Sequence, residues 1–228
     1  MDQALFHLIN ERWTSPTLDL FMAALSNSEI WKPLLIAVGL SALFFGGFKG
    51  RALVVCLILS LLIAELFTGI LKSAVDRRRP KQVESVRMVA MQSTHPKFMT
   101  LFKKPTIRFS DQSDRNRSGP SVPSGHMTSN TIIAVYCTLF YRRRGWLYWI
   151  VAAVVGYSRI YLGAHWPSDI LATLFLATGE ALLMLGLFEW IWRTLGRKWT
   201  PNVYARHPSL IGDLTGRSRP PGASHDSV

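Results

Sequence analysis

Cysteine is scarce in this chain of 228 residues, which contains only Cys56 and Cys137. Both lie inside long apolar segments. A disulfide framework needs several paired cysteines, and a thiolate metal site needs cysteines at close spacing. The sequence therefore excludes both kinds of site and predicts two buried, unreactive thiols.

Acidic residues are also few, since 14 Asp and Glu stand against 26 Lys and Arg and give a net charge of +12. In a soluble protein this excess would suggest a nucleic-acid partner. The sequence has no zinc-finger spacing, RNA-binding aromatic signature or basic zipper. Its basic residues lie between apolar segments and in the tail, where membrane topology and anionic headgroups account for them. We expect no nucleic-acid partner.

Two further signals are missing. No cleavable signal peptide is expected, because Asp2, Glu11 and Arg12 stand where a basic segment would precede an apolar one. Insertion into a membrane then depends on the internal segments. No cluster of Asp, Glu and His has the spacing of metal ligands, so we expect neither a bound metal nor another cofactor.

Long apolar runs are abundant in this chain. Hydrophobic residues make up 49% of it, and the mean hydropathy is +0.18. A helix needs about 20 apolar residues to cross a bilayer. Four stretches approach or exceed this length, and a shorter fifth begins with polar residues: 31–48, 52–71, 146–162, 170–192 and 127–141. Soluble core helices rarely run so long without a charged face. The pattern predicts an all-α fold, a polytopic membrane bundle of five or six transmembrane helices.

The segments outside these runs set the domain organisation. Residues 1–30 are predicted to form one or two short amphipathic helices at the membrane interface, with a helix start at Thr14 or Ser15 and Pro16 just inside the helix. The alternative is that part of this region forms a short extra span. The membrane domain covers 31–200. It contains a polar loop at 77–122, which could fold into short helices or a lid. Residues 201–228 are rich in Pro, Gly, Ser and Arg, which predicts a disordered tail.

Three polar clusters lie where apolar runs end or begin. The first is Lys72 with Arg79-Pro80, the second is Pro123-Ser124-Gly125-His126, and the third is Ser158-Arg159 with His165 and Asp169. Alternating the spans places all three clusters on one face, and the two tight turns at 46–51 and 142–145 on the other. Basic residues in those turns and in the tail favour a cytoplasmic position for the turn face. We expect a bacterial plasma membrane protein whose clusters face the exterior.

The residue types in the clusters suit a phosphate ester. Its hydrolysis needs cationic donors around the phosphate oxygens, an in-line nucleophile and an acid for the leaving oxygen. Arg79 and Arg159 can supply bidentate forks, and Lys72 a point charge. Ser124 and the backbone amides around Gly125 add donors at a helix start.

The two histidines divide the remaining roles. Asp169 lies four residues after His165, so one helical turn lets its carboxylate hold one ring nitrogen and leave the other free to attack. His126 has no acidic neighbour in sequence and suits proton donation. Taken alone, each cluster has a structural explanation, such as an interfacial histidine, a headgroup-binding flank at 77–79 or a Pro-Ser-Gly turn. Their order and shared face favour a site.

Together the clusters resemble the signature of the type-2 phosphatidic acid phosphatase and haloperoxidase superfamily, with every position filled. The resemblance implies a metal-independent phosphatase with a helical-bundle core, and the apolar spans favour its membrane branch over the soluble haloperoxidases. It implies that His165 forms a phosphohistidine, with Asp169 as its partner and His126 as the general acid. The phosphate would be held by Lys72, Arg79, Ser124, Gly125 and Arg159.

The expected activity is that of an integral membrane lipid phosphatase, whose partners are a lipid phosphate substrate and the membrane lipids. Undecaprenyl diphosphate is the first choice of substrate. Phosphatidylglycerophosphate, phosphatidate and lipid A phosphates stay open, because the signature reads the phosphate and not the lipid. A hypothesis from another class is a catalytically silent lipid-binding or transport protein that keeps the pocket.

Overall fold

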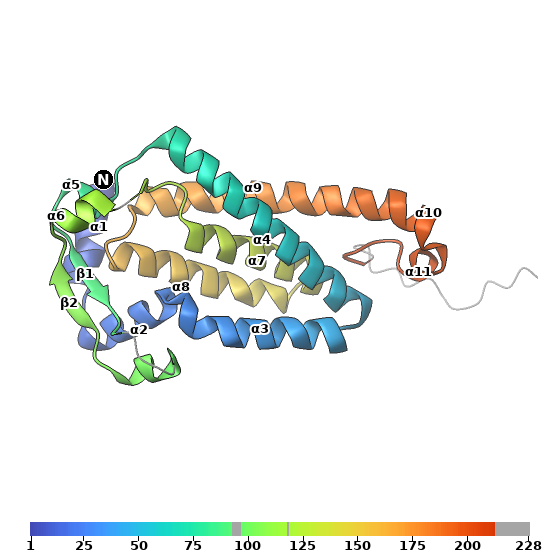
Figure 1. Cartoon of the computed structure of the whole chain (residues 1–228), viewed down its shortest axis with the longest axis horizontal. Helices are drawn as coiled ribbons and strands as arrows, with labels where there is room; N and C mark the ends of the chain where they lie inside the picture. Colours follow the sequence, from blue (N-terminus) through green and yellow to red (C-terminus); the bar gives the residue numbers. More distant parts are fainter. Residues whose placement is uncertain (93–96, 118, 213–228) are drawn as a thin grey trace, which may run out of the picture.

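The computed structural model describes residues 1–92, 97–117 and 119–212. Five helices of 14 residues or more run through this described part and form an elongated bundle (Figure 1). They are α3 (Ser28–Phe45), α4 (Gly47–Val75), α7 (Gly125–Tyr141), α8 (Tyr148–Tyr161) and α9 (Pro167–Ile191). Each matches one of the predicted apolar runs to within a few residues.

Glycines make both predicted tight turns possible. At the turn between α3 and α4, a Cβ on Gly46 would lie 2.3 Å from the Ala42 carbonyl oxygen. At the turn between α7 and α8, a Cβ on Gly145 would lie 1.7 Å from the Cys137 carbonyl oxygen. Only glycine allows the backbone to approach the preceding helix so closely.

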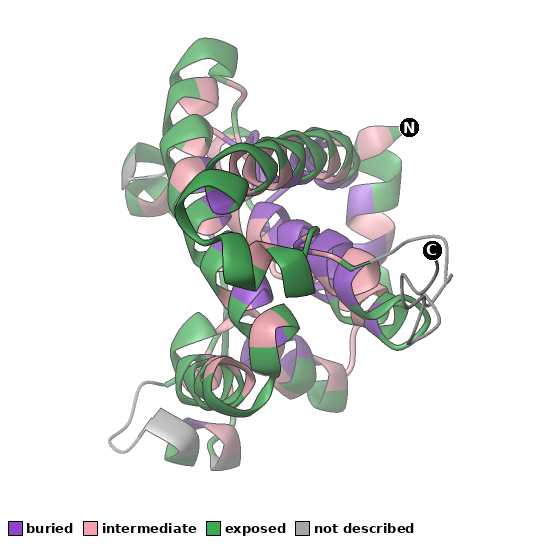
Figure 2. Ribbon diagram, turned by 90° about the vertical axis from the view of Figure 1, so that its right-hand side faces the viewer, coloured by how far each residue is buried: buried purple, intermediate pink, exposed green. Residues whose placement is uncertain are grey.

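The helix surfaces fit a lipid environment. Large apolar side chains point outward, including Phe44, Phe175 and Leu183, which are 65%, 75% and 72% exposed. Exposed residues cover the outer faces of the long helices, and buried residues gather between them (Figure 2). Apolar faces of this extent are unfavourable in water, so the chain is an integral membrane protein.

Three stretches of the described residues are long and apolar enough to cross a membrane: Ser28–Phe45, Gly47–Val83 and Pro167–Trp199. The expected count of five or six spans stays a prediction, since α7 and α8 have only 17 and 14 residues.

Helix α7 is the centre of the bundle and packs against α4, α8 and α9. Its Tyr136 and Phe140 are fully buried. Small residues on the neighbouring helices, Ala64 on α4 and Ala181 on α9, let the backbones approach. This packing fixes the ends of the four helices relative to one another, and those ends carry the predicted clusters.

The N-terminal segment packs onto this bundle. It contains α1 (Asp2–His7), a π-helical turn (Leu8–Arg12) and α2 (Pro16–Ser26). Helix α2 begins as predicted, because the Ser15 side chain accepts a hydrogen bond from the Leu18 amide. Phe6 and Asp19 are buried, and Asp19 forms an ion pair with Arg87 at 2.6 Å. The segment is therefore built into the fold, while its depth relative to a membrane stays a prediction.

The polar loop at 77–122 adds two short strands to a mostly helical fold, which agrees with the predicted helical class. It contains the expected short helices, α5 (Pro80–Val83), a 3-10 helix (Lys97–Phe102) and α6 (Gln112–Arg117). It also contains two antiparallel strands, β1 (Arg87–Ala90) and β2 (Thr106–Phe109), in register from Arg87 opposite Phe109 to Ala90 opposite Thr106. β-Branched Val89, Thr106 and Ile107 favour extended backbone. The sequence prediction used only long apolar runs, so it did not detect this local preference.

The C-terminal segment corrects the predicted start of the tail. After a π-helical turn (Trp192–Gly196), α10 (Arg197–Trp199) and α11 (Pro201–Arg206) continue the chain. Leu210 is buried against the bundle, and its amide donates to the Glu189 carboxylate at 2.8 Å. Residues 201–210 are thus folded, because apolar side chains among them reach the core. The remaining part of the predicted tail, 213–228, lies outside the described residues.

Candidate active site

The fold brings the three polar clusters to one end of the bundle. The C-terminal ends of α4 and α8 meet the N-terminal ends of α7 and α9 there (Figure 1). His165 lies in the loop between α8 and α9, with Lys72, Arg79 and Arg159 close enough to act on it electrostatically. The helix ends therefore form one candidate site, as the alternation of spans predicted.

His165 is the most enclosed member of this site. Its side chain is 3% exposed, and its Nδ1 lies 3.3 Å from the Ser121 hydroxyl. Burial, and then the guanidinium groups of Arg79 and Arg159, hold the pKa of the imidazole well below its ordinary value. The ring is therefore neutral at physiological pH. A neutral imidazole keeps a lone pair on one nitrogen, which a nucleophile requires.

The Asp169 carboxylate is completely buried and is held from both sides. It lies at the third position of α9, where its Oδ2 accepts a hydrogen bond from the Trp166 amide at 2.9 Å. The same oxygen accepts from the Ser121 hydroxyl. The other oxygen, Oδ1, forms an ion pair with Arg77 at 2.8 Å. An unpaired buried carboxylate would be costly, and these contacts keep this one in place.

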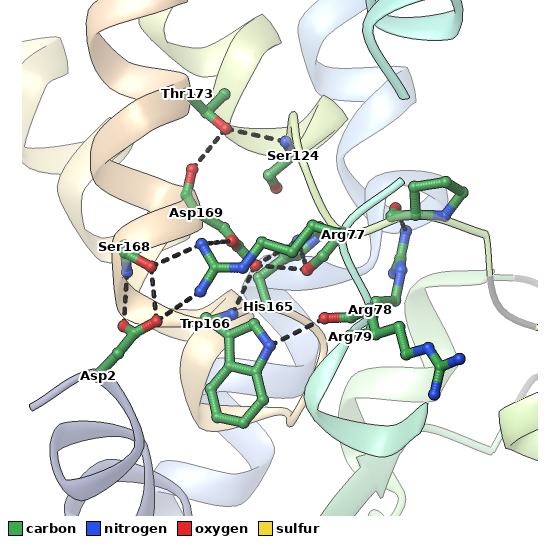
Figure 3. A network of polar contacts seen from close by, with 12 residues as sticks. Asp2, Arg77, Arg78, Arg79, Ser124, His165, Trp166, Ser168, Asp169 and Thr173 are labelled. Atoms are coloured by element: carbon green, nitrogen blue, oxygen red, sulfur yellow. Dashed lines mark hydrogen bonds and ion pairs between the residues drawn. The ribbon is translucent and has the colours of Figure 1, made fainter. Parts of the chain in front are cut away.

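Arg77 is in turn fixed by the N-terminus, as Figure 3 shows. Its guanidinium lies 2.7 Å from the Asp2 carboxylate and donates to the Ser168 hydroxyl at 2.9 Å. Asp2 also accepts hydrogen bonds from the Ser168 amide and hydroxyl, at 2.9 and 2.6 Å. We call Asp2, Arg77 and Ser168 the carboxylate clamp, because together they hold Asp169 at the start of α9.

Replacing Arg77 with glutamine is expected to lower kcat about tenfold and to leave KM nearly unchanged. The Asp169 carboxylate loses a charged partner worth at least one ordinary charged hydrogen bond, but no group that contacts the substrate phosphate is removed. Steady-state kinetics on a lipid phosphate measures the effect. Arg78→Gln is the matched control, since the Arg78 side chain is exposed and bonds to no residue in the described ranges. Equal effects of the two changes would contradict the role of the clamp.

His126 and Arg159 share a neighbour from the N-terminal segment. The Nε2 of His126 is 3.1 Å from the carbonyl oxygen of Ser26, the last residue of α2. Arg159 donates from one terminal nitrogen to the Ser26 hydroxyl. The Arg159 Nε is buried and has no hydrogen-bond partner among the described residues. It can therefore donate to a bound anion.

The start of α7 provides uncharged donors. The Ser124 hydroxyl is buried without a partner in the described part of the chain. Its backbone amide donates to Thr173 of α9 at 3.0 Å, which ties the two helix ends together. A Cβ placed on Gly125 would meet nothing within 4 Å, so space is open beside it. An open space at a helix N-terminus with a free hydroxyl suits a phosphate oxygen.

Lys72 and Arg79 complete the cationic side. Lys72 lies in the last turn of α4, half-buried, and pairs with no residue that the structure describes. Arg79 is partly engaged, because it donates to the carbonyl oxygens of Gly119 and Pro120 at 2.9 and 3.3 Å. It therefore holds the loop before Ser121 as well as adding positive charge. Within the described ranges, no three His, Cys, Asp or Glu side chains are grouped closely enough to hold a metal ion.

The structure adds site residues that the motifs did not indicate. Ser121 lies between His165 and Asp169, Ser26 contacts both His126 and Arg159, and Asp2 reaches α9. Arg77 was visible only as part of a basic flank. No local pattern marks these residues, since each meets its partner across a long stretch of sequence.

Comparisons with known proteins agree with this geometry. A curated undecaprenyl-diphosphatase from Sulfolobus acidocaldarius is 28% identical over 182 residues, 78% of this chain and 74% of that protein. The undecaprenyl-diphosphatase BcrC of Bacillus subtilis is 30% identical over 95 residues, 42% of this chain and 47% of its own length. Against the first curated relatives it matches, the chain spans about a third to a half of their length.

The fold also has a counterpart among solved structures. The crystal structure of Aquifex aeolicus LpxE matches with a TM-score of 0.57 and 23% identity, covering 81% of this chain and 94% of that one. A family model described as the PAP2 superfamily matches residues 53–193. This segment is more than half of the chain and contains all three clusters, which confirms the family expected from them. The chain belongs to the PAP2 superfamily.

Proposed function

We propose that this chain is a membrane lipid phosphatase in which His165 forms a phosphohistidine. The observation that carries the proposal is that a neutral, oriented imidazole lies in the same site as protein hydrogen-bond donors that have no partner and could bind a phosphate. Among the described residues, the Lys72 amine, the Arg159 Nε and the Ser124 hydroxyl have no hydrogen-bond partner. Buried or half-buried donors without partners are costly unless a ligand satisfies them, and a phosphate group satisfies all three.

The reaction proceeds in two steps. In the first, the Nε2 of His165 attacks the terminal phosphorus, the bond from that phosphorus to the oxygen that bridges it to the lipid part breaks, and His126, starting as an imidazolium, gives its proton to that leaving oxygen and becomes neutral. In the second, water attacks the phosphohistidine, His126 takes a proton from that water, and the bond between nitrogen and phosphorus breaks. Lys72, Arg79 and Arg159 balance the charge on the phosphate oxygens in both transition states.

The proposed substrate is undecaprenyl diphosphate. Two relatives carry the name undecaprenyl-diphosphatase, and one of them aligns over most of this chain. Phosphatidylglycerophosphate, phosphatidate and lipid A phosphates are the alternatives, because each residue proposed to bind the substrate is assigned to its phosphate and none is assigned to the lipid. The site is proposed to face the exterior of the plasma membrane, since basic residues gather in the turns and tail at the opposite end.

Phosphate release from purified protein is expected to be fastest with undecaprenyl diphosphate and to survive a chelator. The positive charge that the reaction needs comes from side chains, so EDTA should leave the rate within about twofold. Vanadate should inhibit, because it adopts the five-coordinate geometry of phosphate in the transition state. A panel of lipid phosphates, assayed with and without EDTA and with and without vanadate, measures all three expectations.

The panel also separates the competing functions. If phosphate release is faster with a lipid monophosphate, that lipid and not undecaprenyl diphosphate is the substrate. Loss of activity with EDTA, restored by adding a metal, would contradict the proposal that side chains alone balance the charge of the phosphate. Tight binding of the lipids without phosphate release from any of them would favour the silent binding or transport protein.

A further inference from the structure

The Asp169 carboxylate does not reach His165 directly. The closest atoms, Oδ2 of Asp169 and Nδ1 of His165, are 4.0 Å apart, which is beyond hydrogen-bonding distance. The Ser121 hydroxyl lies between them. Its oxygen is 3.3 Å from Nδ1 of His165, and it donates its proton to Oδ2 of Asp169. All three side chains are buried, so no bulk water competes for these contacts.

The Ser121 hydroxyl has a single proton, and this fixes the direction of the hydrogen bonds that join Asp169, Ser121 and His165. A serine hydroxyl has one proton to donate and two lone pairs to accept with. Because the Ser121 proton is directed to Asp169, Ser121 can only accept from His165. The imidazole must then carry its proton on Nδ1, and Nε2 keeps the lone pair. No residue in the described ranges hydrogen-bonds to Nε2, so this nitrogen is available for attack.

We propose that Ser121 is a positioning residue through which Asp169 orients His165 and stabilises the phosphohistidine. The inference rests on the proposed function. When Nε2 forms its bond to phosphorus, Nδ1 keeps its proton and the ring becomes positively charged. The hydroxyl transmits the negative charge of Asp169 to that ring without any proton leaving it. Among the residues that the structure describes, Asp169 has no other hydrogen-bonded route to the His165 ring.

The surroundings of Ser121 keep the hydroxyl in this position. Its backbone amide donates to the Arg77 carbonyl oxygen at 2.7 Å. Arg79 holds the two preceding carbonyl groups. The Arg77 carbonyl and the Arg79 guanidinium therefore place the bridging serine, in addition to the charge that Arg79 brings to the site. A bridging side chain fixed by its own backbone is a permanent part of the site.

A double-mutant cycle tests the bridge. Ser121→Ala, Asp169→Asn and the double variant are compared for single-turnover phosphoenzyme formation with a radiolabelled lipid phosphate. Each single change is expected to slow the step about 10- to 100-fold, the effect of losing one hydrogen bond to a charged group. The double variant should be no slower than the slower single variant, because both changes break the same route. Ser121→Cys keeps the size and a weak donor, and should fall between serine and alanine.

Ser60→Ala is the matched control, since Ser60 is a buried, hydrogen-bonded serine in the middle of α4. It should form the phosphoenzyme at the wild-type rate. Losses that multiply in the double variant would show that Ser121 and Asp169 act independently and would overturn the bridge. A wild-type rate in Ser121→Ala would do the same. If the wild-type protein itself forms no phosphoenzyme, the proposed function fails first, which the cycle shows separately from a failed bridge.

Discussion

A His165→Ala variant is expected to lose turnover and the phosphoenzyme together, by about 10⁴-fold or more. The reason is geometric, because alanine leaves the phosphate without an attacking atom. Neither Ser121 nor Asp169 can replace the imidazole, since both are buried behind it and bonded to each other. The measurement is single-turnover labelling with a radioactive lipid phosphate, followed by alkaline quenching, which preserves phosphohistidine.

Binding separates this effect from misfolding. The cationic side chains and Ser124 are untouched in the variant, so vanadate or inorganic phosphate should still bind. His207→Ala is the matched control, because His207 is exposed at the opposite end of the molecule, where it stacks on Phe48 at 4.2 Å. It should retain full activity. Phosphohistidine at wild-type levels in His165→Ala would place the nucleophile elsewhere.

The candidate site could be assembled from sequence because its clusters lie at helix ends. Apolar runs of membrane length fix where helices begin and end, and their alternation fixes which ends share a face. Glycines at Gly46 and Gly145 marked the two tight turns between them. The prediction therefore required no knowledge of side-chain packing, only the order of the apolar runs and the polar clusters along the sequence. The helices that carry Lys72, Ser124, Arg159 and Asp169 all end or begin as that order requires.

The supporting contacts could not be obtained in this way. Asp2 meets Ser168 across 166 residues of sequence, and Ser26 meets Arg159 across 133. Such pairs depend on how the N-terminal segment packs against α8 and α9, which hydrophobic periodicity does not specify. The spacing of His165 and Asp169 predicted a direct contact through one helical turn. In the structure Asp169 caps the start of α9 instead, and Ser121 fills the gap.

The N-terminal segment consequently contacts both halves of the site. Asp2 contacts Arg77, which pairs with Asp169, and Ser26 at the end of α2 contacts His126 and Arg159. An amphipathic pattern indicated only that one face of this segment is apolar. Its polar residues Asp2 and Ser26 make the contacts to the candidate site.

The choice of leaving group is expected to distinguish His126 from His165. If His126 supplies a proton to the departing oxygen, His126→Ala should slow phosphoenzyme formation from a lipid monophosphate by about 10²- to 10⁴-fold. An alkoxide is a poor leaving group, and its departure needs that proton. With an aryl phosphate the leaving phenolate is stable unprotonated, so the same variant should lose less than about tenfold.

The contrast with His165→Ala makes the assignment testable in one experiment. That variant should be inactive on both substrates, because the attacking nitrogen is required whatever group departs. The Ser26 carbonyl oxygen, 3.1 Å from Nε2 of His126, accepts a hydrogen bond from that nitrogen, and a leaving oxygen that reaches the same nitrogen would replace it as acceptor. Single-turnover rates with a lipid phosphate and an aryl phosphate, measured for both variants, decide the roles. Equal losses on both substrates in His126→Ala would remove it as the acid, and aryl-phosphate rescue of His165→Ala would exchange the two assignments.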